Sequence, residues 1–114
     1  MARQIIFHGE YFLDFYKDLD VKVKAKIQYV FELIKQVERV PEKFLGPMTG
    51  YEGLFEIRIE YASNIYRIFC CFDEGKLIVL FNGFQKKTQK TPKLEIEKAM
   101  RLKREYFKSK KLKG

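Results

Sequence analysis

Three stretches of strand-like sequence, separated by two short turn signals, constrain the fold of this chain more than any other feature. They run over residues 54–61, 64–73 and 76–84, and in the first of them polar and apolar side chains alternate. Alternation with a period of two is typical of a strand with one face in the core. Ala62-Ser63 and Glu74-Gly75 each predict a two-residue hairpin turn. Strands joined in this way pair antiparallel, so the sequence predicts an antiparallel sheet.

The two turns also predict the register of these strands. A two-residue turn at 62–63 places Arg58 directly opposite Arg67, and the turn at 74–75 places Asn82 beside Arg67. The predicted core face consists of Phe55, Ile57, Ile59, Tyr66, Ile68, Cys70, Phe72, Val79 and Phe81. The opposite face carries Glu56, Arg58, Glu60, Arg67, Asn82 and Lys86 toward one end, and Phe69, Cys71, Ile78 and Leu80 toward the other.

Helical patterns flank the three strands. After a short strand at 3–7, apolar residues at helical spacing predict a helix over 10–19. A second helix is expected to begin after Asp20, which is a good N-cap residue, and to end at Pro41. These two helices form a hairpin whose apolar stripe needs a sheet to cover.

The remaining segments complete the expected topology. Residues 44–53 predict a loop because they contain three glycines and a proline, and a third helix is expected from Pro92 to about Lys111. The order β-α-α-β-β-β-α predicts a single α+β domain over 1–114, with the helical hairpin on one face of an antiparallel sheet. Residues 108–114 are expected to form a frayed basic end.

Positive charge is concentrated in the last quarter of the chain. The net charge is +8, and residues 85–114 hold twelve lysines and arginines against three acidic residues. Such an imbalance is typical of a surface that binds a polyanion, and nucleic acid is the commonest one. The densest part lies where the third strand ends, with Lys86, Lys87 and Lys90 close together. The alternative is a solvated basic loop.

The predicted pairing of Arg58 with Arg67 needs an explanation, because like charges directly opposite destabilise a sheet by a few tenths to about 1 kcal/mol. One interpretation is that Glu56 and Glu60 neutralise both arginines in surface salt bridges. The other is that the arginines and the lysines from 86 onward form an anion site for a phosphate.

Few other residues suggest chemistry. Cys70 and Cys71 are adjacent in a predicted strand and point to opposite faces, so two reduced thiols and a cytoplasmic protein are expected. No Cys/His spacing predicts a metal site, and no signal peptide or membrane span is expected. His8 is a candidate general base by residue type, but it lies far along the chain from the basic cluster.

Four blocks of the sequence, taken in order, resemble a known pattern. They are Leu54-Phe55-Glu56-Ile57-Arg58, Tyr66-Arg67-Ile68, Asp73-Glu74-Gly75 and the stretch from Phe84 to Pro92. Together they resemble the RelE/ParE toxin superfamily, and most closely its phage-derived, HigB-like branch. The resemblance covers residues 3–110, and its ordered set of blocks is more specific than any one of them.

The resemblance implies a RelE-like fold and the toxin of a type II toxin–antitoxin system. Such a toxin is an endoribonuclease that cleaves mRNA in the ribosomal A site by attack of the RNA 2′-hydroxyl, and thereby inhibits translation. It needs no cofactor or metal. Its partners are the ribosome, mRNA and a cognate antitoxin, in this branch usually a helix-turn-helix DNA-binding protein. The free toxin is expected to be a monomer.

The resemblance and the charge pattern together assign roles to eight residues. The candidate catalytic residues are Arg58, Arg67, Lys87 and Glu56, and the candidate RNA-binding residues are Lys86, Lys90, Gln89 and Asn82. The arginines suit stabilisation of charge on phosphorus, Lys87 suits protonation of the leaving oxygen, and Glu56 suits the role of base. Two alternatives remain open, a toxin that poisons DNA gyrase and a non-catalytic module that binds nucleic acid or antitoxin.

Overall fold

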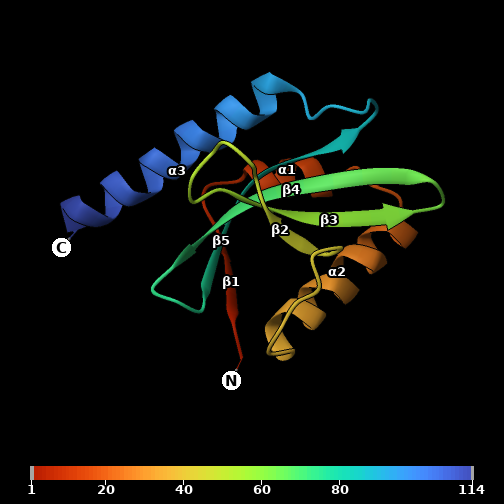
Figure 1. Cartoon of the computed structure of the whole chain (residues 1–114), viewed down its shortest axis with the longest axis horizontal. Helices are drawn as coiled ribbons and strands as arrows, with labels where there is room; N and C mark the ends of the chain where they lie inside the picture. Colours follow the sequence, from red (N-terminus) through yellow and green to blue (C-terminus); the bar gives the residue numbers. More distant parts are fainter. Residues whose placement is uncertain (1, 114) are drawn as a thin grey trace.

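The sheet that the turns predict is present, and it is larger than expected. The computed structural model describes residues 2–113 and forms one α+β domain around a five-stranded mixed sheet, with the strand order β1-β5-β4-β3-β2 (Figure 1). The elements in chain order are β1 (Gln4–Phe7), α1 (Tyr11–Tyr16), α2 (Val21–Gln36), β2 (Leu45–Pro47), β3 (Phe55–Tyr61), β4 (Asn64–Asp73), β5 (Leu77–Lys86) and α3 (Lys93–Lys113).

The two edge strands differ from the prediction. β1 pairs parallel with β5, with Gln4 opposite Leu77, so the sheet is mixed rather than antiparallel throughout. β2 lies within the predicted loop at 44–53 and pairs antiparallel with β3. It forms because Leu45 is buried in the core opposite Ile57, and because an edge strand tolerates glycine and proline.

The register predicted for β3 and β4 is confirmed. Arg58 lies opposite Arg67, and the last pair before the turn is Tyr61 with Asn64. Ala62 and Ser63 form the turn with φ values of 51° and 69°. Two consecutive positive φ angles are the backbone conformation of a type I′ turn, one of the two common types of two-residue hairpin turn.

The register predicted for β5 was wrong by one residue at its start. The last pair beside the turn is Asp73 with Leu77, so the loop contains Glu74, Gly75 and Lys76 rather than two residues. A shift of one residue turns every side chain of a strand to the other face of the sheet. Ile78 and Leu80 therefore lie in the core with the helical hairpin, whereas Val79 and Phe81 lie on the opposite side.

A β-bulge then restores the predicted orientation near the end of β5. Between the pairs Cys70–Leu80 and Ile68–Gly83, β5 advances one residue more than β4. An extra residue of this kind changes the face to which the following side chains point. Arg67 consequently pairs with Phe84 instead of lying beside Asn82, and the end of β5 lies on the face where the sequence predicts it.

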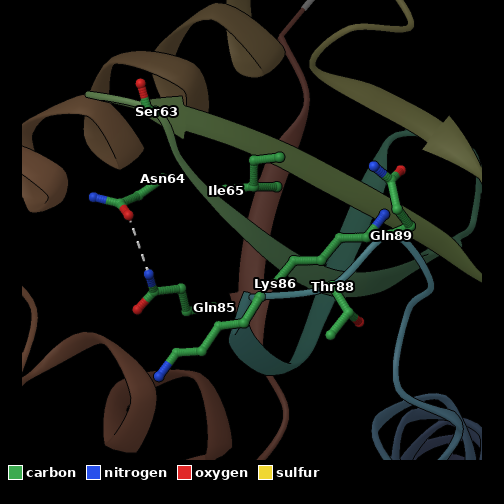
Figure 2. Close-up of a pocket in the computed structure, with 8 residues that line it drawn as sticks. Ser63, Asn64, Ile65, Gln85, Lys86, Thr88 and Gln89 are labelled. Atoms are coloured by element: carbon green, nitrogen blue, oxygen red, sulfur yellow. Dashed lines mark hydrogen bonds between the residues drawn. The ribbon is translucent and has the colours of Figure 1, made fainter.

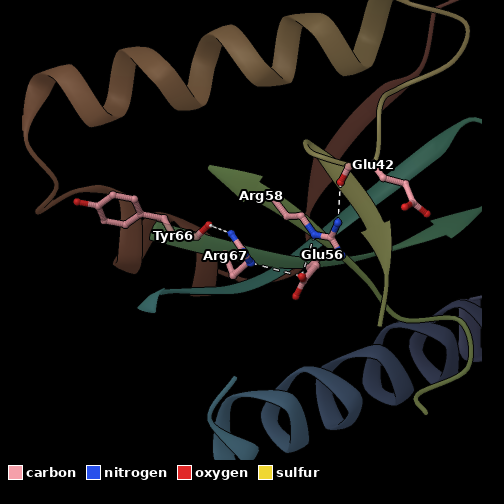
Figure 3. Close-up of polar contacts among 5 residues, drawn as sticks. All are labelled: Glu42, Glu56, Arg58, Tyr66 and Arg67. Carbon is pink, nitrogen blue, oxygen red and sulfur yellow. Dashed lines mark hydrogen bonds and ion pairs between the residues drawn. The ribbon is translucent and has the colours of Figure 1, made fainter. Parts of the chain in front are cut away.

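Both faces of the sheet are covered, each by different helices. α1 and α2 pack on one face, and α3 packs on the other, as Figure 3 shows for α2 and α3. Residues of α3 that close the second core include Ile96, Ala99 and Leu102. The sheet residues under α3 are Leu54, Phe69, Cys71, Val79, Phe81 and Phe84.

Polar contacts fasten the C-terminal half of α3 to the sheet. The Tyr106 hydroxyl and the Lys110 ammonium group both donate to Asp73 Oδ2, at 2.6 and 2.7 Å. These hydrogen bonds, that from Lys110 foremost, lower the pKa of Asp73. The helix continues to Lys113 and so includes most of the basic run that the sequence predicts to fray. No helix within residues 2–113 is both long and apolar enough to cross a membrane.

Candidate functional site

The two arginines of the predicted anion site lie side by side on the sheet face that also carries α3. They occupy opposed positions of β3 and β4, and both reach the same carboxylate oxygen, Glu56 Oε1 (Figure 3). Arg58 Nε donates to it at 3.0 Å, and Arg67 Nε forms an ion pair with it at 3.3 Å. The prediction that both arginines share the face away from the helical hairpin is confirmed.

Glu56 explains how the sheet tolerates this pair of like charges. The residue is only 6% exposed, and the carboxylate bridges the two guanidinium groups at their Nε atoms. The predicted salt-bridge interpretation therefore holds for Glu56, in a buried rather than a surface geometry. Burial lowers the pKa of Arg67, and the charge of Glu56 opposes that effect, which keeps the guanidinium protonated at neutral pH.

Arg58 is also held by the segment around β2, which the sequence predicts to be a loop. Its Nη1 donates to the backbone carbonyl oxygen of Glu42 at 2.7 Å. Its guanidinium group lies against Gly46, where a Cβ atom would be 2.9 Å from Nη2. The glycine thus leaves room for the arginine, and β2 restricts its movement.

The predicted lysine cluster lies at the end of β5, beside the β3–β4 turn. A hollow of about 610 Å³ opens there (Figure 2), and it is lined by Ser63, Asn64, Ile65, Gln85, Lys86, Lys87, Thr88 and Gln89. Lys86 pairs with Ile65 across the strands, so it is the diagonal neighbour of Arg67 on the same face. Such neighbours are about 7–8 Å apart at their Cα atoms, which is within reach of two long side chains that hold one phosphodiester.

Most of the candidate RNA-binding residues lie at this hollow or beside it. Gln89 lines it, and Gln85 donates to Asn64 Oδ1 at 3.3 Å across its mouth. Lys90 follows in the same loop, where its carbonyl oxygen accepts a hydrogen bond from Thr88. Asn64 is a lining residue that the charge pattern did not single out, because it is neutral and lies in a turn.

Asn82 does not belong with these surface residues. It is 2% exposed, and its amide donates to the backbone oxygen and to the Oε1 atom of Glu95, at 3.1 and 3.0 Å. The bulge in β5 turns it under the first turns of α3 instead of placing it beside Arg67. Its contacts position the start of α3, so we leave it out of the proposed RNA contacts.

The other titratable candidates lie away from the arginines. His8 Nε2 is 3.4 Å from Glu105 Oε1, and its ring packs edge-on against Phe81 and Tyr106 under the second half of α3. Cys71 is a free, buried thiol, and burial raises its pKa to about 11, so it is a poor nucleophile. Among residues 2–113, no group of three or more His, Cys, Asp or Glu side chains is placed to hold a metal ion.

Comparison with known proteins identifies the family. Residues 14–104 match the model of a family described as phage-derived Gp49-like proteins, DUF891. A search of curated proteins finds no match to the chain. The match covers most of the chain, from α1 through the first half of α3, and includes both arginines and the lysine cluster. The chain therefore belongs to the phage-derived Gp49-like family.

Proposed function

We propose that this protein is the toxin of a type II toxin–antitoxin system and cleaves mRNA on the ribosome. The observation that carries the proposal is the pair Arg58–Arg67 on one sheet face, with Lys86 as the diagonal neighbour of Arg67. Membership in the phage-derived Gp49-like family agrees with the resemblance of the sequence blocks to RelE/ParE toxins. A basic pair beside a basic loop is the arrangement that an RNA phosphate needs.

The proposed reaction uses the RNA, the side chains at this end of the sheet and the alignment that the ribosome imposes. The 2′-oxygen attacks the adjacent phosphorus, the bond from phosphorus to the 5′-oxygen breaks, and a 2′,3′-cyclic phosphate forms. Arg67 and Arg58 stabilise the charge that develops on the non-bridging oxygens. Lys87, or Lys86, protonates the leaving 5′-oxygen. Alignment of the 2′-oxygen with the phosphorus, imposed on the ribosome, supplies a further share of the rate.

Glu56 suits a positioning role better than the role of general base. Its Oε1 is occupied by two arginines, and its Oε2 is buried, so an RNA hydroxyl does not reach either oxygen without rearrangement. Glu60 lies on the same face of β3 and is exposed. We assign to Glu60 the acceptance of the 2′-hydroxyl proton, and to Glu56 the orientation of both guanidinium groups.

The proposal includes the partners that the resemblance implies. The ribosome presents the mRNA, and a cognate antitoxin with a helix-turn-helix DNA-binding domain neutralises the free, monomeric toxin in the cytoplasm. The basic surface supports the first of these partners, because Lys86 and Lys87 line the hollow at the end of β5 and no acidic side chain lines it.

A second candidate is a non-catalytic module that binds nucleic acid or antitoxin. The specific observation in its favour is the double ion pair of Glu56, which occupies one donor of each arginine and holds Arg67 at 11% side-chain exposure. An arginine that serves only the fold would look the same. Catalysis by Arg67 therefore requires that its remaining donors reach the RNA.

Induced expression in bacteria, followed by mapping of mRNA 5′ ends, separates these functions. The proposed nuclease predicts new ends confined to translated frames, and their loss when translation initiation is blocked. Growth arrest with intact mRNA and broken DNA would indicate a gyrase poison instead. Normal growth with intact mRNA, at a verified level of folded protein, would favour the non-catalytic module.

A further inference from the structure

The outer face of α3 carries a second basic surface, well separated along the helix from the loop that leads out of β5. A hollow of about 350 Å³ is lined there by Lys103, Arg104, Phe107, Lys108 and Lys111. Their spacing of three and four residues places them on one side of the helix. We call this set of residues the α3 basic face.

Within the part of the chain that the structure describes, the basic side chains of the α3 basic face have no carboxylate partner, unlike Arg101 and Lys110 of the same helix. Glu105 is engaged by Arg101 and His8, and Lys110 is bound to Asp73 and Glu74. Among residues 2–113, no ion pair within 4.0 Å involves Arg104, Lys108 or Lys111. Beyond Glu105 the helix contains no acidic residue at all.

The helix segment that carries the α3 basic face is fixed against the sheet. Leu102 is fully buried beneath this part of the helix, and Tyr106 and Lys110 bind Asp73 at the end of β4. The Phe107 ring adds an apolar lining residue to the hollow, and the Lys103 ammonium group lies 5.7 Å from the centre of that ring. A frayed tail would lose conformational entropy when it binds a partner, whereas this helix is already ordered before binding.

We propose that the α3 basic face binds the phosphodiester backbone of double-stranded RNA, as a docking surface separate from the arginine site. Arg104 and Lys111 are about 10 Å apart along the helix axis, at 1.5 Å per residue. Double-stranded DNA carries one negative charge per about 1.7 Å of its axis, counted over both strands, so about six phosphates of a duplex with similar charge density fall within this length, and those on the near side can contact the helix. The choice of RNA over other polyanions rests on the proposed function, because ribosomal RNA surrounds an mRNA in the decoding site.

The test measures binding to a 20-base-pair RNA hairpin as a function of salt concentration. The test variant replaces Arg104, Lys108 and Lys111 by Gln, because these three side chains are exposed. The matched control replaces three exposed residues that lie away from α3, namely Lys17, Lys22 and Arg39, so both proteins lose the same charge. A third variant, with Arg104→Lys, Lys108→Arg and Lys111→Arg, keeps the charge. Thermal unfolding of each protein shows that it is folded.

We expect the test variant to bind at least about tenfold more weakly at 0.1 M salt, and its slope of log affinity against log salt to fall by about 2–3. The control and the charge-keeping variant should stay within about threefold of the wild type. Equal losses in the test and control variants would overturn the proposal, since net charge alone would then explain the binding. Tighter binding to a DNA hairpin of the same sequence would contradict the assignment to RNA.

The outcome is independent of whether the protein is a nuclease. If the proposed cleavage fails, the wild type still binds the hairpin through α3. If the α3 proposal fails, the test variant cleaves mRNA on ribosomes like the wild type, and the arginine site stands unaffected. If the α3 basic face binds an acidic protein instead of RNA, the test variant should bind the RNA hairpin as tightly as the wild type, and the proposal would be overturned.

Discussion

Glu56 bridges the two arginines with its carboxylate, so a substitution that keeps its size but removes its charge should perturb the arginine site more than a comparable change at another residue. Replacing it by Gln preserves its size but removes the charge that separates Arg58 from Arg67. The two guanidinium groups then face each other across β3 and β4 with no counter-ion between them. We expect Glu56→Gln to destabilise the fold and, at the same time, to raise the affinity of this face for anions.

The size of the effect follows from the burial of the three groups. Breaking a buried ion pair costs about 3–5 kcal/mol, because the remaining charge is left without a partner. Here Arg67 is 11% exposed and Arg58 is 29% exposed at the side chain, so water screens the second pair more than the first. The Gln amide retains one hydrogen-bond acceptor. We therefore expect a loss of about 2 kcal/mol in the free energy of unfolding.

The assay is urea unfolding of a double-mutant cycle that combines Glu56→Gln with Arg67→Met. If Glu56 stabilises Arg67, the double variant should lose about 1–2 kcal/mol less free energy of unfolding than the two single variants lose together. Binding of a short RNA without a cleavable 2′-hydroxyl should tighten in Glu56→Gln. Additive losses, or a stability within about 0.5 kcal/mol of the wild type, would refute the role assigned to Glu56.

Three further predictions concern the surface, the core and the C-terminal helix. Changing Lys86 and Lys87 together to Ala should reduce toxicity and leave the unfolding free energy within about 1 kcal/mol, because Lys87 is exposed and Lys86 is only half-buried; unfolded protein in that double variant would mean that the lysines are structural. Gly83→Ala should cost about 1–3 kcal/mol in urea unfolding, since the added Cβ would lie 2.5 Å from the Phe15 ring, and an unchanged midpoint would mean that the ring moves freely. Because the pKa of Asp73 is lowered in the fold, its contribution is present at neutral pH and is lost as pH falls from about 4 through the folded-state value. The stability difference between the wild type and Asp73→Asn should shrink over that range, and a difference independent of pH would contradict the assignment.

The fold was predictable wherever one hairpin signal determined the pairing. The turn at Ala62-Ser63 places Arg58 opposite Arg67, and the structure has that pair. The next turn is one residue longer than its sequence suggests, because Lys76 stays in the loop and its carbonyl oxygen accepts a hydrogen bond from Gln4. The strand β1, which lies 72 residues earlier in the chain when counted from Gln4 to Lys76, thus contacts the start of β5, and no local pattern carries that information.

The candidate site was predictable in its residue types and less so in its geometry. The charge pattern and the ordered blocks point to Arg58, Arg67 and Lys86, which share one face. Glu56 lies opposite Gly46 of β2, and the alternation of β3 does not reveal that this edge strand pairs with it. The turn of Asn82 toward Glu95 depends on a bulge, and the only sign of it in the sequence is the glycine that follows.

The most direct test of the central claim compares Arg67→Ala with the wild type in single-turnover cleavage of mRNA on programmed ribosomes. If Arg67 stabilises the charge that develops on phosphorus, the variant should cleave about a hundred- to a thousandfold more slowly and bind ribosomes within a few-fold of the wild-type affinity. Arg39→Ala, at an exposed loop position, serves as the matched control. An Arg67→Ala protein that is folded and cleaves at the wild-type rate would show that the arginine serves only the ion pair with Glu56.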